Sequence, residues 1–229
     1  MVLKRTVQQT TIRIVLDCLV RQGKSGLSLN DFLWMGLHIT ADLLNVLLQF
    51  KTKLFACISD IEKAFLMVQL IEEDRDYTRF LWLEDPKDPT NPNSKLSVHW
   101  FRVVLFGATC SPFLLNATIK KRLSTVEGDI ERMKRGLYVD NLQFTSNDDN
   151  ELVNFFFEAN KIFAQAYLYL KEWMSNNDSL QTIARAYGIS ARAQTTHKVL
   201  GLNSDKEKDT LTLQPTINTV SPARLRGKC

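Results

Sequence analysis

The stretch GLYVDNLQFT, from Gly136 to Thr145, decides how the rest of the sequence is interpreted. It places an acid, Asp140, directly before an amide, Asn141, between residues that are typical of β-strands. Two interpretations follow. Either Asp140 is a metal-binding carboxylate whose neighbour ought also to be an acid, or VDN is only the turn of a hairpin, where aspartate and asparagine are both common.

The composition is that of a chain able to bury a sizeable core. It has 229 residues, 45% of them hydrophobic, which suits one large domain or two small lobes. A formal net charge of +4 permits nucleic-acid binding without demonstrating it. The 4 cysteines include no CxxC pair, which argues against a zinc site and a disulfide framework and suits a reducing compartment.

No sequence signal directs the chain to a membrane or out of the cell. The N-terminus lacks the basic start, apolar core and small-residue cleavage site of a signal peptide. No stretch approaches the ~18 consecutive apolar residues of a membrane span. We therefore predict an intracellular, cytoplasmic protein that is neither secreted nor membrane-bound.

Strand and helix signals alternate along the first half of the chain. TIRIVLD, KLFACISD, RFLWL and SVHWFRVV predict strands, and the second of these delivers Asp60 to its carboxyl end. The proline-rich linker between the last two predicts an exposed hairpin loop. Helices are expected from about Ala41 to Gln49, with a cap at Thr40, and from Pro112 into KKRLS.

The longest helix is predicted directly after the GLYVDNLQFT stretch. In NDDNELVNFFFEANKIFAQAYLYL, apolar residues recur at helical spacing and form one broad face. These residues are Leu152, Phe155, Phe156, Ala159, Phe163 and Ala166. Two short strands, HKVLGLN and DTLTL, are expected near the C-terminus, joined by the polar SDKEKD.

Two carboxylates occupy positions that suit metal chemistry. Asp60 ends a buried strand, and Asp140 lies at the expected tip of a hairpin. Carboxylates that two strands bring to one edge of a sheet suit hard divalent cations such as Mg²⁺. Two such ions about 4 Å apart activate an attacking hydroxyl and stabilise a leaving pyrophosphate. Because the chain has 25 acidic residues, solvated turn residues are the competing interpretation.

Five motifs then occur in order: ISDIEKAFLMVQL, FGATCSPF, YVDN, LKEWMSN and HKVLGL. With RIVLD, SLNDFL and VLGLNSDKEKDTL, they resemble the reverse transcriptase of Pao/BEL-type LTR retrotransposons over nearly the whole chain. The resemblance implies an α+β fold, the right-hand polymerase fold, with fingers and palm and an antiparallel palm sheet backed by helices. It places the fingers at about 1–53 and 72–105, the palm at about 54–71 and 106–214, and a short basic tail at 215–229.

The same resemblance implies a metal centre. Asp60 and Asp140 are the expected metal-binding carboxylates, and the backbone carbonyl of Ile61 is a further ligand. Asn141 is the remaining member of the catalytic group. The expected cofactors are two Mg²⁺ or Mn²⁺ ions, which neutralise the charge that develops when a primer hydroxyl attacks a triphosphate.

Other residues are expected to contact the nucleotide. Phe65, next to Ala64, looks like the steric gate that excludes a 2′-hydroxyl, with a plain core phenylalanine as the alternative. Arg13 matches a fingers residue that contacts the triphosphate, with a solvent-facing arginine as the alternative. Gly107 has no Cβ and permits close approach to nucleotide and template. Lys171 is expected near the leaving pyrophosphate.

The resemblance also implies contacts with the primer. The VLGL motif resembles the hairpin that grips the primer strand, and it comprises Val199, Leu200, Gly201 and Leu202. A basic cluster is a candidate for the template-primer backbone, with a solvated charged face as the alternative. The cluster comprises Lys120, Lys121, Arg122, Arg132, Lys134 and Arg135.

The sequence departs from the family pattern at several positions. Relatives mostly have YVDD where this chain has YVDN, and the amide of Asn141 keeps an oxygen acceptor but loses the charge. FAQAYLY replaces a stretch that carries a glycine pair in relatives, and Ser204 stands where a tryptophan usually follows LGL. We expect no protease, ribonuclease H or integrase segment within the chain.

Three hypotheses follow. The first is an RNA-directed DNA polymerase module of a retrotransposon, a nucleotidyltransferase whose partners are an RNA or DNA template-primer and deoxynucleotide triphosphates. The second is a catalytically impaired remnant that at most binds nucleic acid, because of Asn141 and the truncation. The third is an unrelated α/β interaction domain. The five ordered motifs favour a polymerase by descent, with impaired activity as the alternative.

Overall fold

A computed structural model of the chain describes residues 2–4, 13–15, 17–23, 25–85, 91, 93–190, 196–199, 202–205 and 210–212. The chain divides into two compact units, Met1–Ser190 and Ala191–Cys229. Among the described residues, no helix has the length and apolar character needed to cross a membrane. The three described cysteines, Cys18, Cys57 and Cys110, are free thiols.

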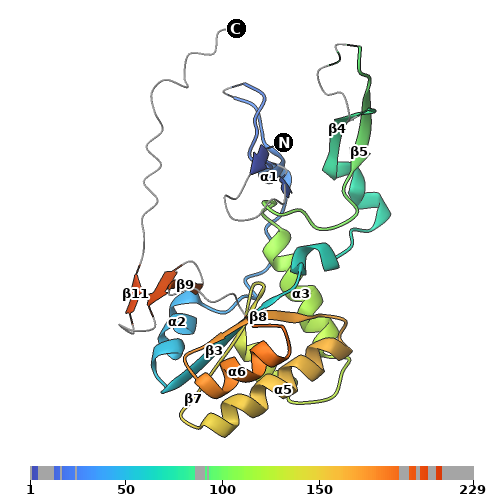
Figure 1. Ribbon diagram of the computed structural model, residues 1–229. Coiled ribbons are helices and arrows are strands. Elements are labelled where there is room, and N and C mark those ends of the chain that lie inside the picture. The colour runs from blue at the N-terminus through green and yellow to red at the C-terminus, as the bar shows by residue number, and fades with distance from the viewer. Residues whose placement is uncertain are drawn as a thin grey trace. The chain divides into compact units, whose positions relative to one another are not determined.

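The larger unit contains a four-stranded antiparallel sheet in the order β6-β7-β3-β8 (Figure 1). Its strands are β6 (Leu137–Tyr138), β7 (Asn141–Ser146), β3 (Phe55–Ile61) and β8 (Leu170–Ser175). The central strand β3 is buried from residue 56 to residue 59, because both of its edges are paired and helices cover one face. The prediction of a buried strand that ends near Asp60 is confirmed.

Three helices share one apolar core with this sheet: α3 (Ser111–Leu123), α5 (Asp149–Gln165) and α6 (Asp178–Ala186). Figure 1 shows α5 and α6 beside β3, β7 and β8. The predicted apolar face of the long helix is confirmed, since all of its members are buried. They are Leu152, Phe155, Phe156, Ala159, Phe163 and Ala166. Each fully buried large side chain contributes about 1.5–3 kcal/mol, so this core dominates the stability of the unit.

Shorter elements precede and flank the sheet. They are β1 (Val2–Lys4), β2 (Arg13–Val15), α1 (Leu29–Phe32), α2 (Leu43–Lys51) and α4 (Ile130–Gly136), and β1 pairs with β2. The helix expected from Ala41 begins two residues later. Its cap is Asp42 rather than Thr40, because the Asp42 side chain accepts a hydrogen bond from the Leu44 amide over 2.8 Å.

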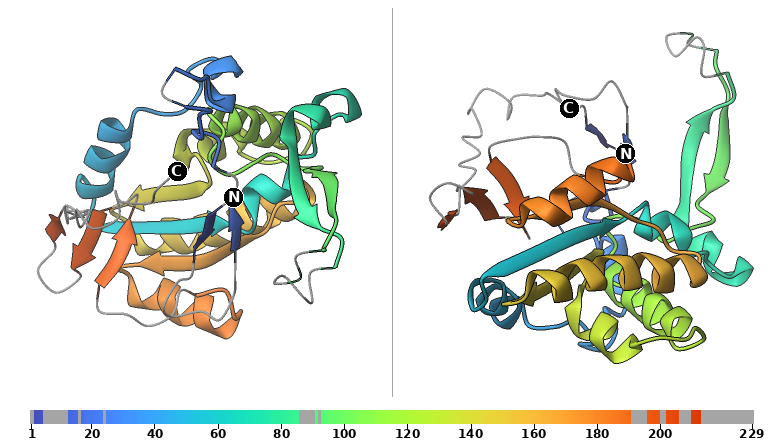
Figure 2. Two further views of the ribbon diagram at one scale, coloured as in Figure 1. Left: turned by 90° about the horizontal axis from the view of Figure 1, so that it is seen from above. Right: turned by 60° about the horizontal axis from the view of Figure 1, so that its bottom comes forward.

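A two-stranded ribbon follows β3 and two 3₁₀ helices. These elements are η1 (Ala64–Met67), η2 (Glu72–Thr78), β4 (Arg79–Leu83) and β5 (Leu96–Trp100). The hairpin expected from RFLWL and SVHWFRVV is confirmed, although β5 ends at Trp100. Figure 2 shows the ribbon in green. Part of the expected hairpin loop, residues 86–90 and 92, lies outside the described residues.

The smaller unit contains a three-stranded antiparallel sheet in the order β11-β10-β9. The strands are β9 (Thr196–Val199), β10 (Leu202–Asp205) and β11 (Thr210–Thr212). HKVLGLN, expected as one strand, is divided between β9 and β10, which pair with each other. DTLTL contains β11, as predicted.

Candidate active site

The two predicted carboxylates and their neighbours come together at one end of β3. Asp60 and Asn141 are cross-strand partners in the β3–β7 register. Asp140 lies in the turn between β6 and β7, as predicted for the tip of a hairpin. The backbone N–H of Ile61 donates a hydrogen bond to the carbonyl oxygen of Asp140 over 2.8 Å, so this turn is tied directly to β3.

The Asp140 carboxyl is half-buried and is hydrogen-bonded by the neighbouring amide. Nδ2 of Asn141 donates to Oδ1 of Asp140 over 3.1 Å. Burial raises the pKa of Asp140 above its ordinary value, and a backbone hydrogen bond opposes this change. Within the part of the chain that the structure describes, no ion pair joins Asp140 to a lysine or arginine. A divalent cation at this position would supply the missing positive charge.

The turn that carries Asp140 has a strained backbone. Val139 has a φ of 52°, and Asp140 does not share this positive φ. This pattern is typical of type II′ turns, whose first central position usually holds glycine. A β-branched residue there costs on the order of 1–3 kcal/mol, and it persists only where the surrounding structure fixes it. One such contact comes from buried Asn116 on α3, whose Nδ2 donates to the carbonyl of Val139 over 3.4 Å.

A β-bulge in β8 places Lys171 opposite Asp60. Two consecutive residues of β8, Glu172 and Trp173, lie opposite a single residue of β3, and Glu172 takes a φ of 53°. The extra residue allows Lys171 and Glu172 to be exposed in succession while Trp173 is fully buried. The bulge therefore sets which face of the sheet the lysine occupies.

Glu62 holds the Lys171 side chain at this edge. Nζ of Lys171 lies 2.9 Å from Oε1 of Glu62, and the side-chain hydrogen bond from Lys171 lowers the pKa of Glu62. Both side chains are partly exposed, so their ion pair contributes little to stability. Its effect is to orient the ammonium group. Glu62 was not predicted, although it follows Asp60 by only two positions.

Phe65 contacts Phe106, the residue that directly precedes Gly107. The rings of Phe65 and Phe106 meet edge to face, with centroids 5.5 Å apart. Phe65 also packs against the core, beside buried Ala64, while Phe106 is 67% exposed. Gly107 has a φ of 105°, which side chains with a Cβ rarely adopt. The Phe65 ring thus contacts both the apolar core and an exposed aromatic side chain.

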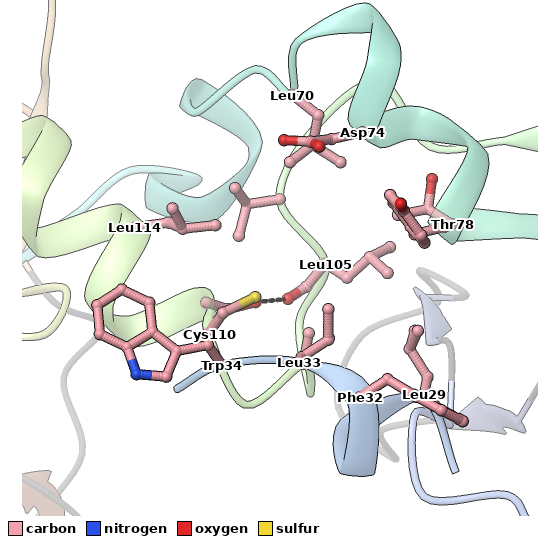
Figure 3. Close-up of a pocket in the computed structure, with 14 residues that line it drawn as sticks. Leu29, Phe32, Leu33, Trp34, Leu70, Asp74, Thr78, Leu105, Cys110 and Leu114 are labelled. Carbon is pink, nitrogen blue, oxygen red and sulfur yellow. Dashed lines mark hydrogen bonds between the residues drawn. The ribbon is translucent and has the colours of Figure 1, made fainter. Parts of the chain in front are cut away.

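An apolar cavity of about 370 Å³ lies beside this region (Figure 3). Its lining comes from α1 and the residues after it, from η2, and from the chain leading into α3; it includes Leu29, Phe32, Trp34, Asp74, Leu105 and Cys110. A polar hollow of about 570 Å³ lies elsewhere, between α2, α4 and β7. Neither Asp60 nor Asp140 lines either one, so the candidate chemistry is outside both.

Several members of the predicted basic cluster make intramolecular contacts. Lys120 and Arg122 donate to backbone carbonyl oxygens over 2.5 Å and 3.3 Å. Arg132 and Lys134 form ion pairs with glutamates. These contacts favour a structural role for the four residues, and contact with a template remains a prediction.

Some predicted residues cannot be compared with this site. Arg13 lies in β2, but its side chain is outside the described part of the chain. Val199 and Leu202 pair across β9 and β10, whereas Leu200 and Gly201 lie outside the described residues. The roles proposed for Arg13 and for the primer hairpin stay predictions.

The oxygen donors at the end of β3 suit a hard cation. Over the described residues, no group of three or more His, Cys, Asp or Glu side chains could hold a metal ion. The predicted ligand set has only two carboxylates, Asp60 and Asp140, together with the carbonyl oxygen of Ile61, and it stays a prediction. Such donors fit Mg²⁺ or Mn²⁺. Asn141 leaves the group with one negative charge fewer than a third acid would give.

Comparison with known proteins gives a clear result for the fold only. No protein-family model and no curated protein matches the sequence. A foamy viral protease-reverse transcriptase dRH, solved in complex with double-stranded DNA, matches 93% of this chain with a TM-score of 0.56 and 16% identity. The chain has a reverse-transcriptase-like fold.

The matched region is a limited part of the viral protein. The chain spans 30% of the length of that foamy viral chain. A second foamy viral protease-reverse transcriptase, in complex with an RNA/DNA hybrid, matches 77% of this chain and 19% of the viral chain, with a TM-score of 0.47 and 16% identity. The first match therefore supports the fold, and it does not show the Pao/BEL type.

Proposed function

We propose that the chain is the polymerase module of a Pao/BEL-type reverse transcriptase, which adds deoxynucleotides to a primer 3′-hydroxyl. The observation that carries the proposal is the meeting of Asp60 with the Asp140–Asn141 turn at one end of β3, within a reverse-transcriptase-like fold. The right-hand arrangement of fingers and palm is part of the proposal.

The proposal gives each residue of the site a task. Asp60, Asp140 and the Ile61 carbonyl hold the divalent cations, which when bound neutralise triphosphate charge and activate the primer hydroxyl. Lys171, oriented by Glu62, places a positive charge where the pyrophosphate departs.

Nucleic acid is the partner that this proposal requires. The foamy viral protein of similar fold was solved with double-stranded DNA, and we expect a template-primer duplex here. The incoming deoxynucleotide lies over Phe65, whose ring contacts the sugar and excludes a 2′-hydroxyl. The net charge of +4 permits such a partner, and binding through phosphate contacts should weaken as the salt concentration increases.

One observation favours a second candidate function, which is nucleic-acid binding without catalysis. Asn141 directs its amide nitrogen to Asp140, so this side chain presents a donor where the family pattern has a carboxylate. A donor repels a cation, and the remaining carboxylates hold it with less charge. This alternative predicts salt-sensitive binding in the absence of primer extension.

Primer extension on an RNA template, with Mg²⁺ or Mn²⁺, tests the proposal. The natural chain is compared with Asp60→Ala, Asp140→Ala and Asn141→Asp. We expect extension by the natural chain and a loss of at least about 100-fold in either alanine variant, because several kcal/mol of transition-state charge stabilisation is removed. Glu127→Gln, which changes an exposed carboxylate elsewhere, is the matched control and should extend normally.

The remaining outcomes separate the two candidate functions. If only Asn141→Asp extends the primer, the fold supports catalysis, and the missing negative charge at position 141 explains why the natural chain does not extend it. If every folded variant is inactive while duplex binding persists, the polymerase proposal is wrong and the binding function stands. Thermal unfolding of each variant identifies any that fail to fold.

A further inference from the structure

The SLND part of the SLNDFL motif has no task in the proposed chemistry, yet its side chains make an ordered set of contacts. Ser28 caps α1: Oδ2 of Asp31 accepts hydrogen bonds from the backbone N–H and the Oγ of Ser28, both over 2.8 Å. These bonds lower the pKa of Asp31. Arg21 adds an exposed ion pair to Asp31. Since a helix of four residues is not stable alone, this cap and the packing of Leu29 against a buried cluster stabilise α1.

Asn30 joins α1 to the loop from Phe106 to Thr109. Its Nδ2 donates to the carbonyl oxygen of Gly107 over 3.1 Å, and its Oδ1 accepts from the Thr109 N–H over 2.8 Å. Its own backbone N–H donates to the carbonyl oxygen of Cys18 over 3.1 Å. The side-chain nitrogen and oxygen of Asn30 thus bond to two backbone groups of the same loop. We call these two hydrogen bonds the Asn30 bridge.

The bridge bonds to the loop whose Phe106 contacts Phe65, the residue that the proposed function places under the nucleotide sugar. Gly107 has a positive φ, which glycine adopts without strain, but glycine is also the most flexible residue, so hydrogen bonds to its neighbours restrict the loop. Phe106 precedes it and meets the ring of Phe65 edge to face. At the far end of the loop, Oγ of Ser111 donates to the carbonyl oxygen of Leu105 over 2.5 Å. This bond joins the two segments that flank the loop, whereas Asn30 bonds directly to Gly107 within it.

We infer that Asn30 is a positioning residue for sugar selection, which holds Phe106 at a fixed separation from Phe65 and so sets the space beneath the incoming deoxynucleoside triphosphate. The inference rests on the proposed function. Asn30 does not touch the nucleotide itself. It acts through the carbonyl of Gly107 and the N–H of Thr109, which lie 77 and 79 positions away in the sequence.

Two substitutions separate the two bonds of the bridge. Asn30→Ala removes both. Asn30→Asp keeps an oxygen that accepts from Thr109 but replaces the donor to Gly107 with a second oxygen, which faces a carbonyl oxygen and repels it. Asn154→Ala, on an exposed part of α5, is the matched control.

The first readout is hydrogen exchange of the Thr109 amide, which requires no catalysis. Asn30→Ala should speed this exchange about tenfold, the factor expected for loss of one hydrogen bond of ordinary strength. Asn30→Asp should change it less, because the acceptor remains. Asn154→Ala should leave it unchanged. Unchanged exchange in Asn30→Ala would show that the bridge does not hold the loop, and the inference would fail.

The second readout is the ratio of affinities for a deoxynucleoside triphosphate and its matching ribonucleoside triphosphate, measured on a complex with a chain-terminated primer. Phe65→Ala should remove most of the preference without changing exchange at Thr109. Asn30→Ala and Asn30→Asp should each reduce the preference about fivefold, because a loosened loop admits the 2′-hydroxyl.

The outcomes separate the inference from the proposed function. If the natural chain prefers the deoxynucleotide and both Asn30 variants prefer it equally, the bridge is purely structural and the inference is wrong. If the natural chain binds neither triphosphate, the proposed function fails and the inference falls with it.

Discussion

The four-stranded sheet and the β4–β5 ribbon use the same antiparallel pairing in opposite surroundings. In the sheet, β3 is paired on both edges and its residues 56 to 59 are buried. In the ribbon, no residue of β4 or β5 is buried, and the cross-strand partners Leu81 and Val98 are 60% and 52% exposed. A two-stranded ribbon without a covered face is marginally stable. Packing of helices against the sheet, rather than strand pairing alone, therefore stabilises the sheet that carries Asp60.

Truncation of the core beneath the sheet should have the largest effect on stability. Phe156 is 1% exposed and packs against Trp173 with ring centroids 4.8 Å apart. Phe156→Ala should lower the free energy of unfolding by about 3–5 kcal/mol, because it removes a buried ring and leaves a cavity. Denaturant unfolding measures this change. A loss below about 1 kcal/mol would contradict the importance of helix packing for the sheet.

The cap of α6 should have the next largest effect. Oδ1 of buried Asn177 accepts from the Leu180 N–H over 2.8 Å, and its Nδ2 donates to Asp149 at the start of α5. Asn177→Ala should cost about 1–2 kcal/mol of unfolding free energy, because the cap is lost. Asn177→Asp keeps the cap acceptor but places a second carboxylate beside Asp149. If both variants lose the same unfolding free energy, the contact between Asn177 and Asp149 contributes more than the cap.

Substitution of Asp140 should change the free energy of unfolding by a smaller amount, and this change should depend on pH. Burial raises its folded-state pKa, so the charged form disfavours the folded state at neutral pH. The penalty is relieved as pH falls through the raised folded value, and it vanishes below the ordinary value of 3.8. Asp140→Asn should therefore stabilise the chain at neutral pH, and this gain should disappear in acid.

Unfolding of the natural chain and Asp140→Asn over a pH series measures this effect. Added Mg²⁺ gives a second comparison, since a cation that binds only the folded state stabilises it. It should raise the melting temperature of the natural chain more than that of Asp140→Asn. Equal shifts in the two proteins would count against Asp140 as a ligand.

The ribbon should give the smallest effect. Leu81→Thr replaces an exposed side chain with a β-branched residue that suits a strand, and we expect a change in unfolding free energy within about 0.5 kcal/mol. Hydrogen exchange should also be much faster in β4 than in β3, since few buried contacts protect the ribbon. Slow exchange in β4 would show that the ribbon has support comparable to that of the sheet.

Residue periodicity explains which elements the sequence predicts. Helix α5 is predictable because Leu152, Phe155 and Phe156 begin an unbroken helical repeat over a fully buried face. Strand β8 is not, because its bulge interrupts the alternation that identifies strands. In LKEWMS, two exposed residues follow each other before Trp173 returns to the core.

The site is predictable only where local sequence patterns carry the information. Motif order and the positions of Asp60 and Asp140 at strand ends indicate the carboxylates from sequence alone. The contacts around them cannot be identified from the sequence, since Asn116 bonds to the carbonyl of Val139, 23 positions away, and Lys171 pairs with Glu62, which follows β3. Such contacts depend on tertiary packing, which local patterns do not encode.

The bulge in β8 constrains the length of this strand as well as its composition. Leu170 and Trp173 both face the core although they are three positions apart, which an unbroken strand forbids because alternate residues share a face. Removing one residue between them would turn either Lys171 away from Asp60 or Trp173 out of the core. Point substitutions at Glu172 leave the spacing between Leu170 and Trp173 intact. A one-residue deletion there changes which side chains of the strand face the core. Deletions and insertions, rather than exchanges of side chains, are therefore the changes that this edge of the sheet tolerates least.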